Sequence, residues 1–315
     1  MTSPLESPPA LSRRPLVGLA TVILSLAPAI EAAEQTFNLK AGWNAVFLEI
    51  RPSQPSPSTL FAGLPVERCS AWLPTVAQVD SLTDPAALPR KSSSWQNWLP
   101  SSHPASFLNN LHAVTGRQAL LIQTSAACVW TVTGEPVFER RKWIAPSFNF
   151  TGFDVDPAAP PTFARFFDGS PAHQPVRAFK LVSDRWIAVA PTETIRRGEG
   201  YWVWCDTGSE HQGPLDVSIP IAGDGGVVSS DGGSFSLQMR KNGQLPVSAQ
   251  ITSSGSVSFA RLTGIHTESP LTGSQSLDPR AEWRVRTSGP GAGLLQITGG
   301  GVRISVPVEV PAASN

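Results

Sequence analysis

The chain has 315 residues, of which 41% are hydrophobic, so it can form two or three domains that each bury a core. Its 24 Lys and Arg balance 24 Asp and Glu. A balanced chain offers no excess positive charge to a nucleic-acid backbone or an anionic membrane surface, so we expect neither partner. The 30 Pro and 26 Gly indicate many turns, which favours β structure over helical bundles.

The N-terminal segment resembles an export signal. Arg13–Arg14 are followed by the mostly apolar residues 15–30 and then by the small Ala32–Ala33. The apolar stretch is too short to span a membrane comfortably, and no other stretch approaches the roughly 20 apolar residues of a membrane helix. We therefore predict a signal peptide at residues 1–33 and an extracytoplasmic mature chain that is periplasmic, cell-surface or secreted. The general secretory and twin-arginine routes both stay open.

Three cysteines, Cys69, Cys128 and Cys205, allow one disulfide at most and leave one thiol free. A Cys69–Cys128 bridge and three buried thiols are the alternatives. No Cys or His cluster has the spacing of a zinc site, so we predict no metal and no other cofactor.

Two stretches of the chain repeat one pattern. Residues 42–52 and 147–157 each carry an aromatic residue followed by Asn, then apolar positions and a closing Pro, at an offset of 105. A second match pairs residues 116–122 with 198–204 at an offset of 82. The first copy therefore carries extra residues, which we place in two loops within 75–93 and 101–115.

Each copy is expected to be β-rich. The first opens with a strand through Trp43 to Ile50. In the second, Phe163, Phe166 and Phe167 lie at i, i+3 and i+4, which predicts a short helix that ends at a glycine. Further short strands are predicted at Phe179–Val182, Trp186–Ala190 and Tyr201–Cys205.

Past Pro220 the aromatic residues become rare and alternating strands begin. The longest is Val302–Val310, with apolar residues at even positions and Arg303, Ser305 and Glu309 on the other face. Several such strands predict an immunoglobulin-like β-sandwich in general plan. The predicted fold class is all-β with a few short helices. We expect four segments: the signal peptide at 1–33, β-rich repeat units at 34–140 and 141–220, and the sandwich at 221–315.

Short motifs in the two copies resemble a largely uncharacterised family of repeats in exported bacterial surface and secreted proteins. In that family a strand with "GWN" opens the unit, as in Leu39–Asn44, and a strand with "GYW" lies near its end, as in Gly198–Val203. Such units often accompany immunoglobulin-like domains. The resemblance covers residues 35–220 and implies location and architecture more than activity. This chain splits the pattern, since Gln118–Leu120 replaces "GYW" in the first copy and Ser147–Asn149 replaces "GWN" in the second.

Ten Trp and a single Tyr raise the hypothesis of a sugar-binding surface. At the offset of 82, Trp202 aligns with Leu120, and a position that accepts either residue is better explained by burial in a core. Trp98 lies next to the loop insertions of the first copy, so we expect it to be exposed. Trp98 and Trp95 are therefore the candidate ligand-binding residues.

Catalytic motifs are missing from the sequence, and we predict no catalytic residue. No G-x-S-x-G or S-x-x-K occurs, and the five His lie in loop-like contexts. Asp154 and Asp156 share one strand face and could bind a cation or act as a carboxylate pair. Their counterparts in the first copy are Glu49 and Arg51, which favours a solvated face instead.

These observations favour an exported, non-enzymatic structural, adhesive or interaction protein with an unknown protein or polysaccharide partner. The alternative is a carbohydrate-binding protein that uses exposed Trp. A hydrolase whose site is assembled from distant residues is the third hypothesis.

Overall fold

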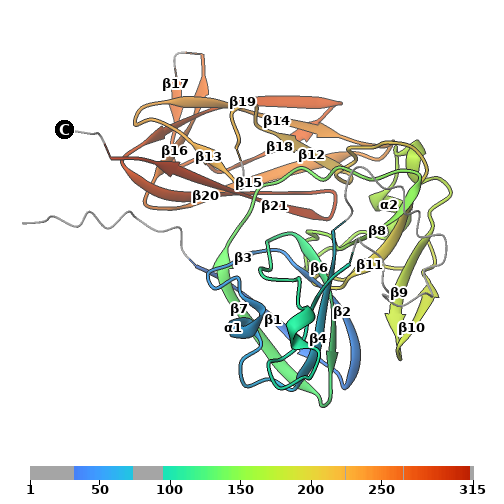
Figure 1. Cartoon of the computed structure of the whole chain (residues 1–315). Coiled ribbons are helices and arrows are strands. Elements are labelled where there is room, and N and C mark those ends of the chain that lie inside the picture. Colours follow the sequence, from blue (N-terminus) through green and yellow to red (C-terminus); the bar gives the residue numbers. More distant parts are fainter. Residues whose placement is uncertain (1–31, 74–94, 224, 265, 313–315) are drawn as a thin grey trace, which may run out of the picture.

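A computed structural model of the chain describes residues 32–73, 95–223, 225–264 and 266–312 (Figure 1). Most of the predicted signal peptide and the predicted loop within 75–93 lie outside these residues. The described chain consists mainly of strands in five sheets, with short helices between them, so the all-β prediction is confirmed. Within the described ranges, no helix is long and apolar enough to cross a membrane.

The first part of the chain contains two sheets, coloured blue to green in Figure 1. A four-stranded sheet has the order β2-β6-β4-β5, and a three-stranded sheet has the order β1-β7-β3. The elements are β1 (Ala33–Leu39), β2 (Gly42–Leu48), β3 (Arg51–Pro52), α1 (Pro57–Leu60), β4 (Val66–Trp72), β5 (Trp95–Trp98), η1 (Ser106–Leu108), β6 (Gln118–Thr124) and β7 (Cys128–Glu135). Their core is built around Leu48, Leu120 and Trp130, all nearly inaccessible to solvent.

The second part forms one antiparallel sheet with the order β8-β11-β9-β10. The elements are β8 (Ser147–Thr151), α2 (Phe163–Phe166), η2 (Pro171–His173), β9 (Ala178–Val182), β10 (Arg185–Ala188) and β11 (Tyr201–Cys205). The predicted helix is confirmed: Thr162 caps it by accepting a hydrogen bond from the backbone N–H of Arg165, and its three Phe are buried. The helix ends at Phe166, and the turn that follows it ends at Gly169, whose φ of +80° favours glycine.

The two four-stranded sheets share one strand order. In each, the first strand along the chain lies at an edge beside the last strand, and the second and third strands follow. The Asn of the aromatic–Asn pair also makes the same contacts in both. Asn44 accepts from the N–H of Lys40 and donates to its carbonyl, both at 2.8 Å, and Asn149 does the same with Ile144 at 2.9 Å. This Asn therefore closes the turn that leads into the opening strand.

Strand pairing corrects the predicted alignment of the closing strands by one residue. Ala45 and Phe150 occupy matching positions in the opening strands, 105 apart, and they face Leu121 and Trp202. Trp202 therefore corresponds to Leu121 rather than to Leu120. A shift of one residue turns a side chain to the opposite face of a strand. Accordingly, Leu121 and Trp202 share one cluster, whereas Leu120 belongs to the core of the first part.

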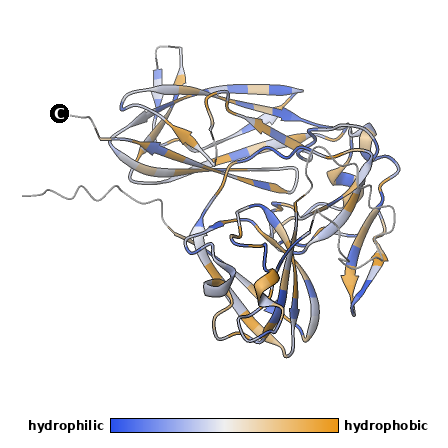
Figure 2. Ribbon diagram, in the orientation of Figure 1, coloured by the Kyte–Doolittle hydropathy of each residue, from blue (hydrophilic) through white to orange (hydrophobic). Residues whose placement is uncertain are grey.

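The third part is a sandwich of two five-stranded sheets, with the orders β12-β14-β19-β16-β17 and β13-β21-β20-β15-β18. Its strands are β12 (Leu215–Ser218), β13 (Val227–Val228), β14 (Ser234–Lys241), β15 (Val247–Gly255), β16 (Ser258–Thr263), β17 (His266–Glu268), β18 (Gly273–Leu277), β19 (Arg280–Ser288), β20 (Gly291–Gly299) and β21 (Val302–Val310). Hydrophobic and hydrophilic residues alternate along these strands (Figure 2). Since β12 pairs with β14, the sandwich begins ahead of the boundary predicted at 221.

The two four-stranded sheets pack against each other through an aromatic interface. We define this interface by its buried residues Phe47, Trp95, Ala119, Leu121, Phe148, Phe150 and Trp202. Trp202 is 1% exposed, and its ring lies 5.3 Å from Trp72 and 5.9 Å from Trp95, both in the facing sheet. The prediction that Trp202 is a core residue is therefore confirmed. Half-buried aromatic residues, including Trp43, Trp186 and Trp204, surround the interface.

Candidate functional site

Trp98 is buried, which contradicts the prediction that it is exposed. It is 7% exposed, its indole N–H donates to Ser58 Oγ at 3.1 Å, and its ring lies 5.4 Å from that of Phe61. The reason is tertiary: β5 is the edge strand beside β4, and α1 covers its inner face. No sugar can stack on a ring in this position.

Trp95 is equally unavailable, because it belongs to the aromatic interface. It is 5% exposed and contacts Trp202 and Phe150 of the opposite sheet, both with ring centroids 5.9 Å away. The two Trp selected from the sequence therefore lie in separate clusters and form no common surface.

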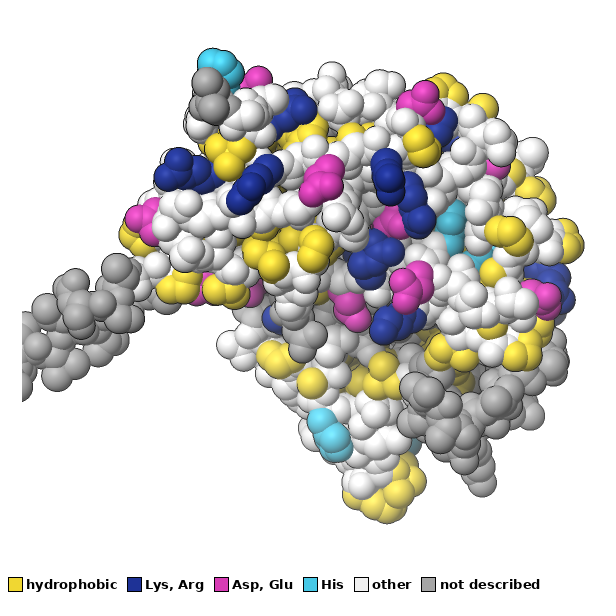
Figure 3. All heavy atoms as spheres, turned by 90° about the horizontal axis from the view of Figure 1, so that it is seen from above, with side chains coloured by type: hydrophobic (Ala, Val, Ile, Leu, Met, Phe, Trp, Pro, Cys, Tyr) yellow, Lys and Arg dark blue, Asp and Glu magenta, His cyan; other side chains and the backbone are white. Residues whose placement is uncertain are grey.

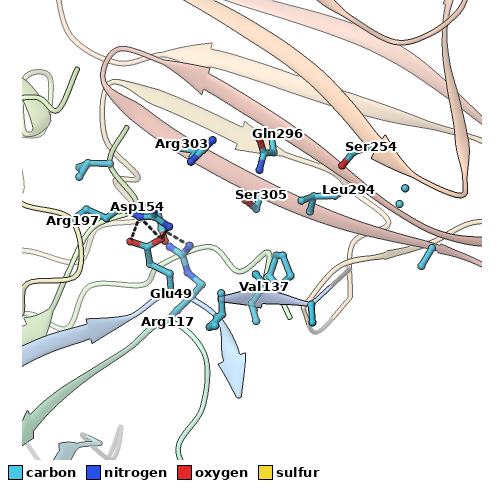
Figure 4. A pocket seen from close by; sticks show the side chains of 18 residues that line it. Glu49, Arg117, Val137, Asp154, Arg197, Ser254, Leu294, Gln296, Arg303 and Ser305 are labelled. Atoms are coloured by element: carbon cyan, nitrogen blue, oxygen red, sulfur yellow. Dashed lines mark hydrogen bonds and ion pairs between the residues drawn. The ribbon is translucent and has the colours of Figure 1, made fainter. Parts of the chain in front are cut away.

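A pocket of about 280 Å³ lies where the three parts of the chain meet (Figure 4). One wall carries charged residues that follow or precede strands of the two four-stranded sheets. The other wall is the outer face of β20 and β21, with polar residues at Gln296, Arg303 and Ser305, together with Ser254 at the end of β15. Arg303 and Ser305 are half-buried because they face this pocket, whereas the alternation in the sequence indicated only an outer face.

Two reciprocal ion pairs form the charged wall of the pocket. Glu49 follows β2 of the first part and pairs with Arg197, which precedes β11 of the second; the closest N–O distance is 2.6 Å. Asp154 follows β8 of the second part and pairs with Arg117, which precedes β6 of the first. Each part thus supplies one carboxylate and one arginine to its neighbour, as at a two-fold contact.

Glu49, Arg117 and Asp154 are largely withdrawn from water, whereas the side chain of Arg197 is 39% exposed. Burial raises the pKa of Glu49, and the hydrogen bond from Arg197 opposes this effect. The same hydrogen bond raises the pKa of Arg197. Behind the wall, burial lowers the pKa of Arg141 to about 9, with Arg117 contributing in the same direction. The Arg141 guanidinium lies 5.1 Å from the ring centroids of both Trp143 and Phe153.

The remaining cation of the pocket is Arg303. In the part of the chain that the structure describes, it forms no ion pair, and its Nε is buried without a hydrogen-bond partner. The pocket therefore holds three arginines against two carboxylates. A buried donor without a partner is costly, and an anionic group would satisfy it. Alternation alone could have drawn attention to Arg303, but not to the wall that it faces.

Asp154 and Asp156 do not share a face. Asp154 turns into the pocket toward Arg117, whereas Asp156 accepts a hydrogen bond from the backbone N–H of Ala158. The chain bends between them, since β8 ends at Thr151 and the N–H of Val155 bonds to the carbonyl of Phe153. The predicted solvated face is therefore wrong for Asp154, whose side chain is 20% exposed.

A Ser–His contact, which the sequence did not reveal, lies inside the second part. Ser170 Oγ is 2.7 Å from His173 Nδ1, but the two residues are only 4% and 1% exposed. The His173 ring lies 4.5 Å from Trp143 and 4.6 Å from Phe167. Burial lowers its pKa to about 3, and His211 and Arg141 add to the effect. With no access to substrate, this pair is a packing element.

His173 should make the protein less stable at acidic pH. The unfolded chain binds a proton near the ordinary pKa of 6.5, whereas the folded chain binds it only near 3. The contribution of neutral His173 to the free energy of unfolding is therefore fully present above pH 6.5. It decreases as the pH falls toward 3, and at pH 5 the free energy of unfolding is lower by about 2 kcal/mol. In urea titrations, His173→Asn should reduce the difference between pH 7 and pH 5. The exposed His266→Asn should leave that difference unchanged, and equal differences in all three proteins would contradict the assignment.

All three cysteines are free thiols, so the alternative of a Cys69–Cys128 bridge is wrong. Burial raises the pKa of Cys69 well above its ordinary value and that of Cys205 to about 11. The two buried thiols are therefore protonated at neutral pH, which makes them poor nucleophiles.

Comparison with other proteins does not assign this chain to a known family. Among the described residues, no group of three or more His, Cys, Asp or Glu is placed to hold a metal ion. No model of a known protein family matches the chain, and no curated protein matches it either.

Proposed function

We propose that this chain is an exported, non-enzymatic interaction protein, in which two copies of one β unit and an immunoglobulin-like sandwich form one stiff body. The shared strand order and the matching Asn contacts support the duplication. The resemblance of the "GWN" and "GYW" strands to repeats of exported proteins supports the location.

The aromatic interface is the observation that carries this proposal. Trp95 and Trp202, which a sugar-binding protein would present to solvent, are instead used to join the two units. Aromatic side chains bury 150–250 Å² each, so a cluster of this kind strongly favours a fixed arrangement of the two sheets. The reciprocal ion pairs add a second contact between the two units, and backbone hydrogen bonds, such as that from the N–H of Arg303 to the carbonyl of Asp154, join the second unit to the sandwich. A stiff body with several outer faces suits a spacer or an adhesive module.

Calorimetry and activity assays test this proposal. We expect the mature chain to unfold in a single thermal transition, because the units share buried surfaces. Two well-separated transitions would show that the parts are independent. Reproducible turnover of a common ester, peptide or glycoside substrate would overturn the non-enzymatic part of the proposal.

A second candidate function is the binding of a small acidic sugar in the pocket. The unpaired Nε of Arg303 favours it, because a guanidinium recognises a carboxylate by paired N–H donors. Ser254, Gln296 and Ser305 would offer hydrogen bonds to hydroxyl groups. In this candidate function the sugar is recognised by polar side chains of the pocket and not by stacking on exposed Trp.

Arg303→Gln tests the pocket. Wild-type protein should bind galacturonate more tightly than galactose, and the substitution should weaken galacturonate binding by tenfold or more, as expected for loss of a hydrogen bond to a charged group. Isothermal titration calorimetry measures both affinities. Arg185→Gln, at an exposed position in β10, is the control and should bind like the wild type. Equal binding of the two sugars would contradict this candidate.

A further inference from the structure

The outer face of one sandwich sheet carries a row of arginines. Arg280, Arg284 and Arg286 alternate along β19 and are exposed, and Arg240 of β14 lies directly opposite Arg280. Seen from above, Lys and Arg side chains gather over this sheet, with fewer acidic side chains among them (Figure 3). We call these four residues the arginine row.

Most of the positive charge in the arginine row is not neutralised within the protein. Arg240 is paired with Asp216 at 2.8 Å, and the same carboxylate also pairs with Arg140. In the described ranges, none of the three arginines of β19 forms an ion pair with a carboxylate. Glu282 lies between them and accepts a hydrogen bond from Ser236. Arg240 and Arg280 are like charges on opposite strands, which is unfavourable, so folding does not account for this pair.

The shape of this face suits an extended polymer. Alternate residues on a strand are about 6.7 Å apart, so the row extends over roughly 20 Å from Arg280 to Arg286. Ser234 and Ser236 of β14 lie opposite Arg286 and Arg284, whereas Glu282 lies between Arg280 and Arg284, with Gln238 opposite it. The guanidinium groups therefore follow one line across this face, and a hollow lined by Arg240, Arg280 and Glu282 lies at one end of it. An anion that repeats along a chain can contact several of them, whereas a single small anion cannot.

We propose that the arginine row binds an acidic polysaccharide through its carboxylates. The inference rests on the proposed exported interaction protein and names the class of its partner. Guanidinium groups bind carboxylates in paired geometry, and the serines of this face can hydrogen-bond to sugar hydroxyls. Single-stranded nucleic acid is the competing polyanion. It is disfavoured because the row contains no aromatic side chain on which bases could stack.

Affinity electrophoresis in gels that contain polygalacturonate tests the proposal. The protein is the whole chain without its predicted signal segment. We expect strong retardation at low salt, loss of retardation at high salt, and none in neutral dextran. The triple variant Arg280→Ser, Arg284→Ser, Arg286→Ser should bind polygalacturonate at least tenfold more weakly.

A charge-matched triple variant separates the row from net charge. Lys40→Ser, Arg185→Ser, Arg196→Ser removes three exposed cations from other faces and should bind like the wild type. Equal weakening in both triple variants, or no retardation of the wild type, would overturn the proposal. Tighter binding of single-stranded DNA than of polygalacturonate would overturn it in favour of nucleic acid. A single calorimetric transition in each variant would show that the proposed stiff body is intact whichever result is obtained.

Discussion

Trp202→Ala should destabilise the protein by about 3–5 kcal/mol, the range found when a buried aromatic residue is truncated in a core. Trp202 is 1% exposed and contacts aromatic residues of both sheets, including Trp72, Trp95 and Phe150. The cavity cannot close without moving two sheets that backbone hydrogen bonds hold in place. Differential scanning calorimetry should show a Tm lowered by about 10 °C.

The control for this substitution is an aromatic residue that contacts little. Phe107, in η1, is 81% exposed, so Phe107→Ala should change stability by no more than about 0.5 kcal/mol. If Trp202→Ala left the Tm unchanged, the aromatic interface would not hold the two sheets together. Limited proteolysis adds a second measurement, because loss of the interface should expose cleavage sites in both sheets at once.

Asp216→Ala should cost about 2 kcal/mol, because it removes a buried carboxylate that accepts hydrogen bonds from two partly exposed arginines. Asp216 is 5% exposed on β12 and accepts hydrogen bonds from Arg140, in the segment that leads into the second part, and from Arg240 on β14. The substitution removes a buried acceptor of both hydrogen bonds, but Arg240 is 61% exposed and stays hydrated, so the loss falls mainly on the contact with Arg140. Urea unfolding at pH 7 measures the loss. It should persist in high salt, because buried pairs are weakly screened.

Two controls show whether the effect belongs to the buried carboxylate. Asp216→Asn keeps the shape and part of the hydrogen bonding, so it should lose less stability than Asp216→Ala. Asp278→Ala removes a carboxylate that is 94% exposed and 3.9 Å from Lys241, and it should change stability by less than about 1 kcal/mol. An effect of Asp278→Ala as large as that of Asp216→Ala would contradict the assignment.

Local patterns were enough to predict most of the elements. The phenylalanines at i, i+3 and i+4 predicted α2, and the alternation of Val302–Val310 predicted β21, because helix and strand each place side chains at a fixed period. The strand at Tyr201–Cys205 matches β11. The aromatic–Asn pairs at 43–44 and 148–149 were visible as a repeat, although their role in closing a turn was not.

Register and exposure could not be derived in the same way. The alignment of the closing strands was wrong by one residue, because hydrophobic runs such as Ala119–Ile122 are buried on both faces and show no alternation. The position of Trp98 beside loop insertions predicts exposure. In the structure it is covered by α1 and Phe61, which are distant along the chain.

The sequence by itself determined that this protein is all-β, with short helices, repeated aromatic–Asn strands and an alternating C-terminal part. These properties depend on periodicity and on neighbouring residues. Only the tertiary structure decided which side chains meet. It brought Glu49 to Arg197 and Asp154 to Arg117, left Arg303 unpaired in a pocket, and aligned three exposed arginines along one strand. Such contacts join residues that are far apart in the chain, and local sequence patterns do not show which distant residues come together in the fold.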